Sequence, residues 1–360
     1  MQPFPTAPTA ILGAGLMGIS ISAAHLRCGL PVILYDSAET ALETAPQRLR
    51  EELRQQNQPF RPSSAAYTRN LHDVLPCRIV IESIPEKIRA KQKLYQQLTE
   101  IAPPELLLLT NTSTISISLL AEKLPADRQQ QFCGFHFFHP VRQRPLLEII
   151  AGKNTAPAAV QAAVHHAQKI GKYPITVGDS PGFLVNRILH PLLSAALSLL
   201  EEGIDLRQIE TAALNFGMKM GPFRLMDEIG LDVVLHAGWV LFKAFPERAV
   251  THPVLLQLIE RGEMGRKSGT GFMTYRNAVS GDGCGEPRPQ FLNSNSRISE
   301  TEIVRRLFLP MYEEAVRCCK EGVIGSADAA DSASVEALGF PAAKKGIISW
   351  GKHFLENPNR

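Results

Sequence analysis

C-x-x-C motifs and long apolar runs are both missing from this sequence of 360 residues. The cysteines are scattered without a C-x-x-C pair, which argues against a disulfide framework or a zinc site and predicts a reduced compartment. The longest apolar stretch, Leu192–Leu200, is too short to span a membrane. The sequence also lacks the basic region of a signal peptide, so we expect a cytoplasmic protein. The six cysteines are Cys28, Cys77, Cys133, Cys284, Cys318 and Cys319.

The sequence also lacks a large excess of either positive or negative residues. The 38 basic residues nearly offset the 35 acidic ones and leave a net charge of +3. A charge this small argues against nucleic acid or a membrane surface as the partner. At 44% hydrophobic residues the composition is that of a globular protein, and 360 residues are enough for two or three domains.

The first half of the chain alternates short apolar stretches with helical patterns. The helical patterns include 16–29 and 38–58. This alternation is typical of β-α-β units and predicts an α/β Rossmann-type, doubly wound parallel sheet in a domain spanning 1–180. The expected strands are Thr9–Leu12, Val32–Tyr35, Arg78–Ile81, Leu106–Leu109 and Phe132–Phe135.

The second half is predicted to be all helical. A buried helix is expected over Phe183–Glu202, a linker over Asn277–Arg297, and further helices from Ser299. We expect one helical domain with its linker at 181–290 and a partial repeat of it at 291–360. Gly and Pro positions recur at a fixed offset, 203 with 322 and 222 with 341 (322 − 203 = 119; 341 − 222 = 119). This recurrence predicts a duplication.

A glycine-rich turn stands between the first expected strand and the first expected helix. Gly13, Gly15 and Gly18, with Leu16 and Met17 between them, form a G-x-G-x-x-G motif. These glycines allow a tight turn, close approach of the backbone to a pyrophosphate, and close packing of the helix. Asp36 ends the next strand, where its carboxylate can bind the ribose hydroxyls and repel a 2′-phosphate. The motif predicts NAD as the cofactor. A glycine-rich turn with Asp36 as a helix cap is the alternative.

A histidine follows the last expected strand. His136 is placed at the carboxyl end of the sheet, where ligands bind in this fold. Glu148 lies in an apolar run and needs a partner if it is buried, and His136 is the obvious one. Such a pair suits a general base for hydride transfer from an alcohol. A metal site at His136, His139 and Glu148 is the alternative, but the spacing follows a strand and we expect no metal.

Motifs in order along the chain resemble those of the (S)-3-hydroxyacyl-CoA dehydrogenase family. The resemblance implies NAD-dependent oxidation of a 3-hydroxyacyl-CoA to a 3-oxoacyl-CoA, in fatty-acid β-oxidation or related short-chain acyl-CoA metabolism. It implies His136 as the base and Glu148 as its partner. The motifs are GAGLMG (13–18), IESIPE (81–86), NTST (111–114), GFHFFHPV (134–141), LLEII (146–150), DSPGFLVNR (179–187), MGPF (220–223), DEIGLD (227–232) and GRKSGTGF (265–272).

The same resemblance implies further site residues. Ser113 and Asn186 match the residues that bind the substrate hydroxyl and the thioester oxygen. Glu86 and Lys91 match the pair that lines the nicotinamide side of the cleft. His139 stands where the family usually has Asn and is expected to bind substrate, with a larger and titratable side chain.

The last segment resembles the second C-terminal copy in multifunctional fatty-acid oxidation proteins. Single-copy relatives dimerise through this domain, so a built-in second copy predicts a monomer, with a homodimer as the alternative. His165 and His166 are expected on an exposed helix face. Two other functions stay open beside the acyl-CoA substrate: a dehydrogenase of a small hydroxy acid without CoA, and a catalytically silent NAD-binding structural protein.

Overall fold

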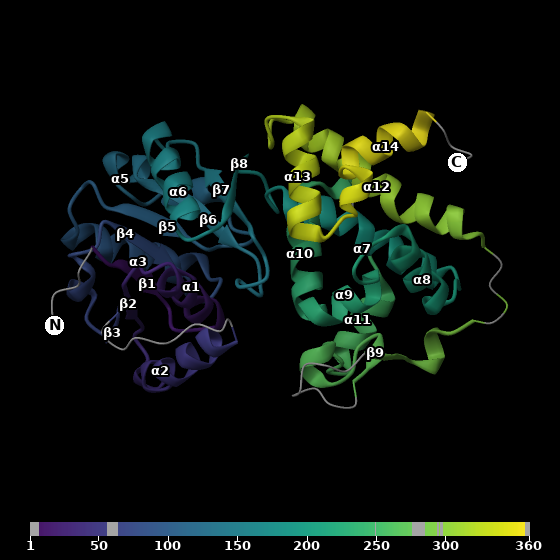
Figure 1. Cartoon of the computed structure of the whole chain (residues 1–360), viewed down its shortest axis with the longest axis horizontal. Coiled ribbons are helices and arrows are strands. Elements are labelled where there is room, and N and C mark those ends of the chain that lie inside the picture. Colours follow the sequence, from purple (N-terminus) through teal and green to yellow (C-terminus); the bar gives the residue numbers. More distant parts are fainter. Residues whose placement is uncertain are drawn as a thin grey trace. The chain divides into compact units, whose positions relative to one another are not determined.

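The chain folds into two compact units, Met1–Ser180 and Pro181–Arg360 (Figure 1). The computed structural model describes residues 7–55, 64–248, 250–275, 285–293, 295 and 298–356. Cys284 and part of the expected linker lie outside these ranges. The other five cysteines have free thiols.

An eight-stranded sheet forms the centre of the first unit, with strand order β3-β2-β1-β4-β5-β6-β7-β8. The chain adds β2 and β3 on one side of β1, and β4 and β5 on the other side. In such sheets, dinucleotides bind in the crevice where this order reverses, so the carboxyl ends of β1, β4 and β5 border that crevice. The strands are β1 (Thr9–Leu12), β2 (Val32–Tyr35), β3 (Ala65–Thr68), β4 (Ile79–Glu82), β5 (Leu107–Thr110), β6 (Phe132–Phe137), β7 (Leu146–Ala151) and β8 (Tyr173–Gly178).

The expected doubly wound sheet is confirmed, but it is parallel everywhere except at one place. All neighbouring strands are parallel except β6 and β7, which are antiparallel. The connection between them, 138–145, is too short for the crossover that a parallel neighbour requires. The five expected strands are present. β3, β7 and β8 were not expected, because β3 (AAYT) is only weakly apolar, β7 is an apolar run without alternation, and β8 contains Pro174.

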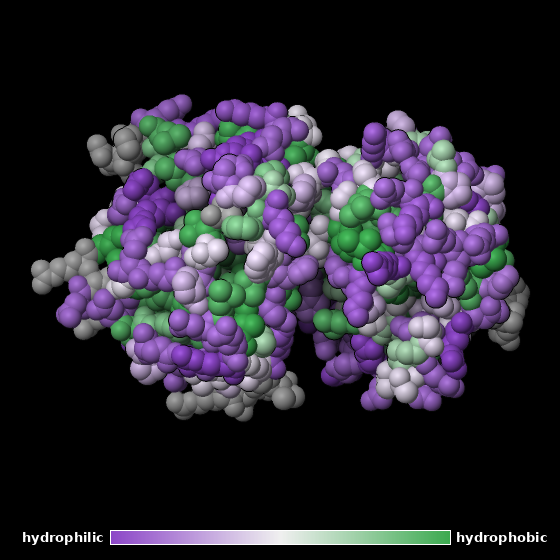
Figure 2. All heavy atoms as spheres, turned by 180° about the vertical axis from the view of Figure 1, so that it is seen from behind, coloured by the Kyte–Doolittle hydropathy of each residue, from purple (hydrophilic) through white to green (hydrophobic). Residues whose placement is uncertain are grey.

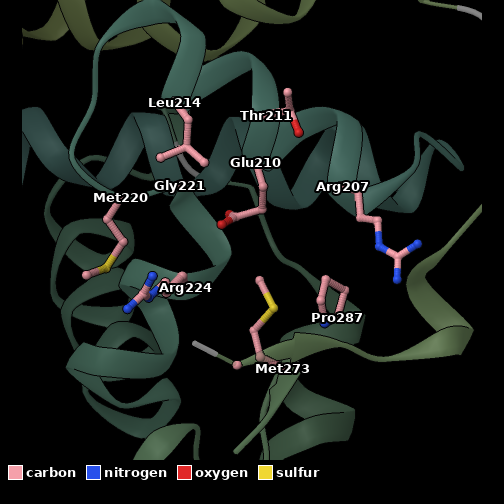
Figure 3. A pocket seen from close by; sticks show the side chains of 10 residues that line it. Arg207, Glu210, Thr211, Leu214, Met220, Gly221, Arg224, Met273 and Pro287 are labelled. Carbon is pink, nitrogen blue, oxygen red and sulfur yellow. The ribbon is translucent and has the colours of Figure 1, made fainter. Parts of the chain in front are cut away.

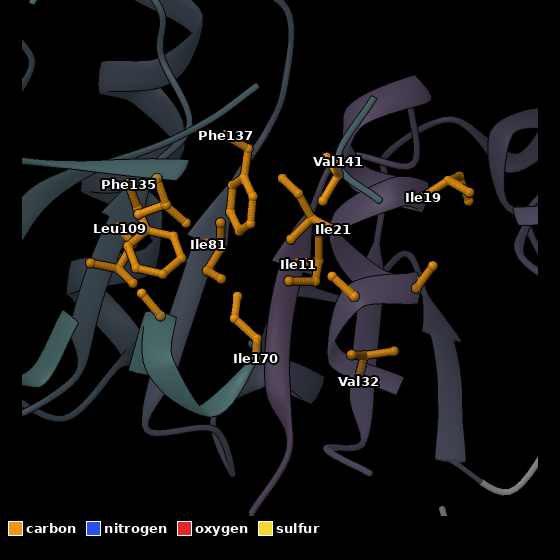
Figure 4. Packing of buried hydrophobic residues seen from close by; sticks show 14 of the residues in the cluster. Ile11, Ile19, Ile21, Val32, Ile81, Leu109, Phe135, Phe137, Val141 and Ile170 are labelled. Atoms are coloured by element: carbon orange, nitrogen blue, oxygen red, sulfur yellow. The ribbon is translucent and has the colours of Figure 1, made fainter. Parts of the chain in front are cut away.

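Helices cover both faces of the sheet. On one face, α1, α2 and α6 enclose a core that includes Ile11, Ile81 and Phe135 (Figure 4). On the other face, Tyr95 of α3 contacts Phe132 of β6. The helices of this unit are α1 (Leu16–Arg27), α2 (Glu39–Arg54), α3 (Ile88–Ile101), α4 (Ile117–Ala121), α5 (Ala126–Gln130), α6 (Pro157–Lys169) and the 3₁₀ helix η2 (Leu71–Val74).

The expected exposure of His166 is wrong, although His165 is exposed. His166 of α6 is 5% exposed and His25 of α1 is fully buried. Their Nε2 atoms lie 2.9 Å apart, and His25 Nδ1 lies 2.7 Å from the carbonyl oxygen of Ile21. Burial lowers the pKa of His25 to about 4 and that of His166 to about 3. This pair therefore joins two helices inside the core as neutral imidazoles.

The second unit is helical apart from the short pair β9 (Met273–Thr274) and β10 (Glu286–Pro287). β10 and the 3₁₀ helix η5 (Pro289–Phe291) lie within the expected linker, which is thus partly ordered. The helices are α7 (Val185–Glu201), α8 (Leu206–Phe216), α9 (Pro222–Ile229), α10 (Leu231–Ala244), α11 (Pro253–Glu260), α12 (Glu300–Lys320), α13 (Ala327–Leu338), α14 (Ile347–Glu356), and the 3₁₀ helices η3 (Pro246–Arg248), η4 (Arg266–Ser268), η5 (Pro289–Phe291) and η6 (Ala342–Lys344).

The stretch α7–α9 and the stretch α12–α14 share a local design. α8 and α13 both end at a glycine in the left-handed region, Gly217 with φ 112° and Gly339 with φ 68°. In each stretch, a buried carboxylate of the helix that ends at this glycine accepts a hydrogen bond from a backbone N–H in the first turn of the following α-helix. Glu210 Oε1 accepts from the backbone N–H of Phe223, and Asp331 Oδ1 accepts from that of Ile348. α7 packs directly against α12.

The surface has both hydrophilic and apolar regions. Hydrophilic side chains cover most of both units in the space-filling view, with smaller apolar patches between them (Figure 2). Among the described residues, no helix has both the length and the apolar content to cross a membrane.

Candidate active site

The glycine-rich turn after β1 leaves room for a phosphate group. A Cβ on Gly13, whose φ is +110°, would lie 2.6 Å from the carbonyl oxygen of Ser83, and a Cβ on Gly18 would lie 1.7 Å from that of Gly13. Gly15 faces open space. Leu16 and Met17 form the first turn of α1, and no described side chain caps this helix at Gly15. The N–H groups of that turn can therefore bind a pyrophosphate, and the turn fits NAD.

Asp36 lies beside the glycine turn, at the end of β2. Its Oδ2 accepts from the backbone N–H of Ala14 at 2.7 Å, and its Oδ1 accepts from that of Ala38 at 2.9 Å. Each oxygen keeps a lone pair for a ribose hydroxyl. Sequence reasoning missed Arg48 of α2, whose Nη1 donates to the carbonyl oxygen of Ala14 at 2.7 Å and holds the turn from the other side. Nothing in the helical pattern distinguishes it from its neighbouring arginines.

His136 and Glu148 lie together, as expected from the sequence. They are directly opposite in the antiparallel pair β6–β7, and His136 Nδ1 lies 2.8 Å from Glu148 Oε2. Glu148 is fully buried, whereas His136 is 5% exposed. The carboxylate engages Nδ1 and so orients the ring; with the hydrogen on Nδ1, Nε2 is the basic nitrogen of the imidazole. Asn111 at the end of β5 accepts from the backbone N–H of Phe137 at 2.9 Å and ties the two strand ends together.

Ser113, Glu86 and Lys91 are brought together at the carboxyl ends of β4 and β5. Glu86 Oε1 accepts from Thr112 Oγ1 at 2.6 Å and from the backbone N–H of Ser113 at 3.0 Å. Glu86 Oε2 lies 3.3 Å from Lys91 Nζ. Burial opposes ionisation of Glu86, but the charge of Lys91 and these hydrogen bonds hold its pKa below the usual value. Glu86 therefore fixes the loop that carries Ser113.

Lys91 also binds Glu82, which sequence reasoning missed. Glu82 ends β4 and is fully buried. It accepts from Lys91 Nζ at 2.6 Å, from Thr110 Oγ1 at 2.7 Å and from Tyr95 Oη at 2.5 Å. The only indication in the sequence is a carboxylate that ends an apolar strand and therefore needs partners.

His139 follows β6 in a loop. Partial burial lowers its pKa from the usual value, and Arg142 and Arg144 lower it further, against the charge of Glu52. Arg142 Nη1 lies 3.3 Å from Glu52 Oε1. The charged groups that act on His139 thus belong to α2 and to the loop before β7. Its role in binding substrate stays a prediction.

Asn186 belongs to the second unit, on the first turn of α7. Its role toward the thioester oxygen also stays a prediction. The second unit has a cavity of about 240 Å³ between α8, α9 and β9, into which Glu210 points beside Met220, Arg224 and Met273 (Figure 3). Burial raises the pKa of Glu210 to about 7. None of the catalytic, substrate-binding or cofactor-binding residues expected from the sequence lines this cavity, although Met220 and Gly221 of the MGPF motif do. Within the described ranges, no group of three His, Cys, Asp or Glu side chains could hold a metal ion.

Two family models match this chain. The model of the 3-hydroxyacyl-CoA dehydrogenase NAD-binding domain matches residues 8–180, and that of the C-terminal domain of the same enzymes matches residues 182–275. The chain belongs to the 3-hydroxyacyl-CoA dehydrogenase family. It is an NAD-dependent oxidoreductase, and the sequence-based expectations of family and cofactor are confirmed.

One solved structure agrees with this assignment, and two others share the fold. The (S)-3-hydroxybutyryl-CoA dehydrogenase from Ralstonia eutropha is 31% identical with a TM-score of 0.70, and the alignment covers 75% of this chain and 99% of that one. The 3-hydroxybutyryl-CoA dehydrogenase from Escherichia coli K12 shares the fold over 98% of this chain and 92% of that one, with 24% identity and a TM-score of 0.82. The dehydrogenase part of multifunctional enzyme 1 from C. elegans shares it over 97% and 79%, with 24% identity and a TM-score of 0.65.

Proposed function

We propose that this dehydrogenase oxidises the hydroxyl of (S)-3-hydroxyacyl-CoA to the 3-oxo group, with His136 as the base. The observation that carries this proposal is the buried contact of 2.8 Å between His136 Nδ1 and Glu148 Oε2 at the carboxyl end of the sheet. His136 Nε2 takes the proton of the substrate hydroxyl, and the Glu148 carboxylate stabilises the imidazolium that forms. NAD, when bound, supplies the acceptor for the hydride.

Other residues of the chain position the reactants. Ser113 binds the substrate hydroxyl, on a loop that Glu86 holds by hydrogen bonds and Lys91 by its ion pair with Glu86. Asn186 donates from its carboxamide to the thioester oxygen, and His139 binds substrate in place of the usual Asn. The CoA thioester itself is supported by the named substrate of the Ralstonia enzyme, which three quarters of this chain matches.

The absorbance of NADH at 340 nm tests the proposal. With NAD and a ladder of (S)-3-hydroxyacyl-CoA lengths, the purified chain should produce NADH for at least one length. His136→Ala should abolish this turnover and leave the Kd for NADH unchanged. Absence of turnover at every length would refute the substrate class, and activity retained in His136→Ala would refute the base.

We further propose that the two helical stretches arose by duplication and that the chain is a monomer. The support is the design common to α7–α9 and α12–α14 and the packing of α7 on α12, a surface that the second copy occupies within one chain. Light scattering after size exclusion should give 39.6 kDa. Twice that mass would refute the monomer. The cytoplasmic location stays a prediction from the cysteine pattern.

A further inference from the structure

A buried arginine follows directly after Asn186 on the first turn of α7. Arg187 is 1% exposed. Its Nε donates to Glu314 Oε1 at 2.9 Å, and its Nη1 lies 2.8 Å from Glu321 Oε2. Glu314 is on α12, 127 positions later in the chain, and Glu321 follows the end of that helix. The last part of the chain therefore holds the start of α7.

A second arginine completes this cluster. Arg248 Nη1 lies 3.3 Å from Glu314 Oε1, and its Nη2 lies 2.9 Å from Glu321 Oε1. The guanidinium groups of Arg187 and Arg248 lie 4.6 Å and 4.5 Å from the centroid of the Phe245 ring. The two arginines and the two carboxylates thus form one cluster, and both cations lie over the same aromatic ring. Removal of one carboxylate would leave a buried positive charge with less compensation.

The opposite end of the same helix pair has an equivalent ion pair. Arg306 Nη2 lies 2.5 Å from Glu202 Oε1. Arg306 and Glu321 stand at the same offset from Arg187 and Glu202 (306 − 187 = 119; 321 − 202 = 119). The pairs Arg187–Glu321 and Arg306–Glu202 are therefore counterparts. The second pair is open to solvent, since the side chain of Arg306 is 28% exposed and that of Glu202 is 51% exposed.

The two ends of the α7–α12 pair differ in sequence, and only one of them carries Asn186. The counterpart of Glu314 is Ala195, and the counterpart of Asn186 is Arg305 (314 − 195 = 119; 305 − 186 = 119). Arg305 pairs on the surface with Glu302 of its own helix, at 2.6 Å. The additional carboxylate and the burial occur only at the end that carries Asn186. A need to join the two helices would apply equally at both ends, so it does not explain this difference.

We propose that Glu314, together with Glu321, is a positioning residue for the substrate site. Through Arg187 it holds the first turn of α7, and so the carboxamide of Asn186, in the orientation that binds the thioester oxygen. This inference rests on the proposed function, because it needs Asn186 to contact substrate. It assigns to the last segment of the chain a part in substrate binding. Single-copy relatives, which lack this segment, must position the equivalent residue in another way.

The experiment compares Glu314→Gln with Glu202→Gln in the full chain. Both substitutions neutralise one carboxylate between α7 and α12 with little change of size, but only the first lies at the Asn186 end. Glu314→Gln should lower kcat/KM for the acyl-CoA by about 10- to 100-fold, through the KM for acyl-CoA more than through kcat, since small displacements of a binding group cost about this much. The Kd for NADH should stay unchanged, and Glu202→Gln should stay within about twofold on every parameter.

A double variant separates positioning from stability. Asn186→Ala should show the same KM defect, and Asn186→Ala with Glu314→Gln should be no worse than Asn186→Ala alone, because coupled residues are not additive. Glu321→Gln, whose carboxylate is one-third exposed, serves if Glu314→Gln does not fold. Wild-type kinetics in Glu314→Gln and Glu321→Gln, or a fully additive double variant, would overturn the inference and leave the proposed function intact. Absence of wild-type turnover would instead refute the proposed function.

Discussion

His136 and Glu148 are only twelve positions apart in the chain, yet each is the direct cross-strand partner of the other. This relationship exists because β7 runs antiparallel to β6. In a parallel neighbour, the residues opposite His136 would come from beyond a helical crossover. Because β7 is antiparallel to β6, the Glu148 carboxylate lies beside His136 at the same end of the sheet as the glycine-rich turn.

Glu148→Gln should lower kcat by about 100-fold or more, within the range of a general base that loses its support. Gln can still accept from Nδ1–H and keep the ring in place, but it cannot stabilise the imidazolium by charge. Steady-state kinetics at saturating NAD and acyl-CoA measure this effect. The Kd for NADH serves as the control and should not change. A kcat within threefold of wild type would show that Glu148 is structural only.

Asp36→Asn should weaken the preference for NAD over NADP. The carboxylate is expected to accept from the ribose hydroxyls and to repel a 2′-phosphate. A charged hydrogen-bond partner contributes about 1.5–3 kcal/mol, which corresponds to about 10- to 100-fold in affinity. Quenching of protein fluorescence gives the Kd values for NADH and NADPH. Because Asn keeps an acceptor for the N–H of Ala14, the turn should persist. An unchanged ratio of the two Kd values would contradict the role of Asp36.

Lys91→Met should destabilise the chain more than Lys91→Met combined with Glu82→Gln. Lys91 and Glu82 are 1% and 0% exposed and lie 2.6 Å apart. Loss of one partner of a buried pair costs about 3–5 kcal/mol because the other charge stays behind, whereas loss of both charges costs less. Urea unfolding followed by circular dichroism measures the order of the variants. If the double variant is the less stable one, Glu82 and Lys91 do not act as a compensating pair.

Local features of the site could be predicted from the sequence, whereas contacts between distant segments could not. The glycine turn, Asp36 and the His136–Glu148 pair are defined by short spacings and by the need of a buried carboxylate for a partner. The antiparallel β7 was not expected, because its apolar run carries no information about direction. Arg187 and Glu314 meet across 127 positions, and no single helix pattern indicates such a partner.

His166 shows the same limit. The adjacent pair His165-His166 suggests a polar helix face, but His166 lies on the same side of α6 as Ala163 and Ile170, which are buried. Its partner His25 lies 141 positions earlier, on another helix. Only the topology of the sheet, which brings α1 and α6 to one face, places the two rings together.

The His25–His166 pair should make stability depend on pH in a defined direction. In the unfolded chain both rings titrate near 6.5, but burial, and for His166 the nearby His25, Lys169 and His165, keep the folded values at about 4 and about 3. Between pH 6.5 and pH 4 the unfolded chain therefore binds more protons than the folded one. The contribution of this pair to the free energy of unfolding must fall as the pH falls through this window, by up to about 1.4 kcal/mol per pH unit for each histidine.

His166→Gln should remove part of this dependence. Urea unfolding at several pH values between 4.5 and 7 gives the slope for wild type and variant. Other buried groups, such as His190 with its pKa lowered to about 4 and Glu210 with its pKa raised to about 7, are the same in both proteins and cancel in the difference. His165→Gln, at the exposed neighbouring position, is the matched control and should keep the wild-type slope. Equal slopes for His166→Gln and wild type would mean that the pair is not kept neutral by the fold.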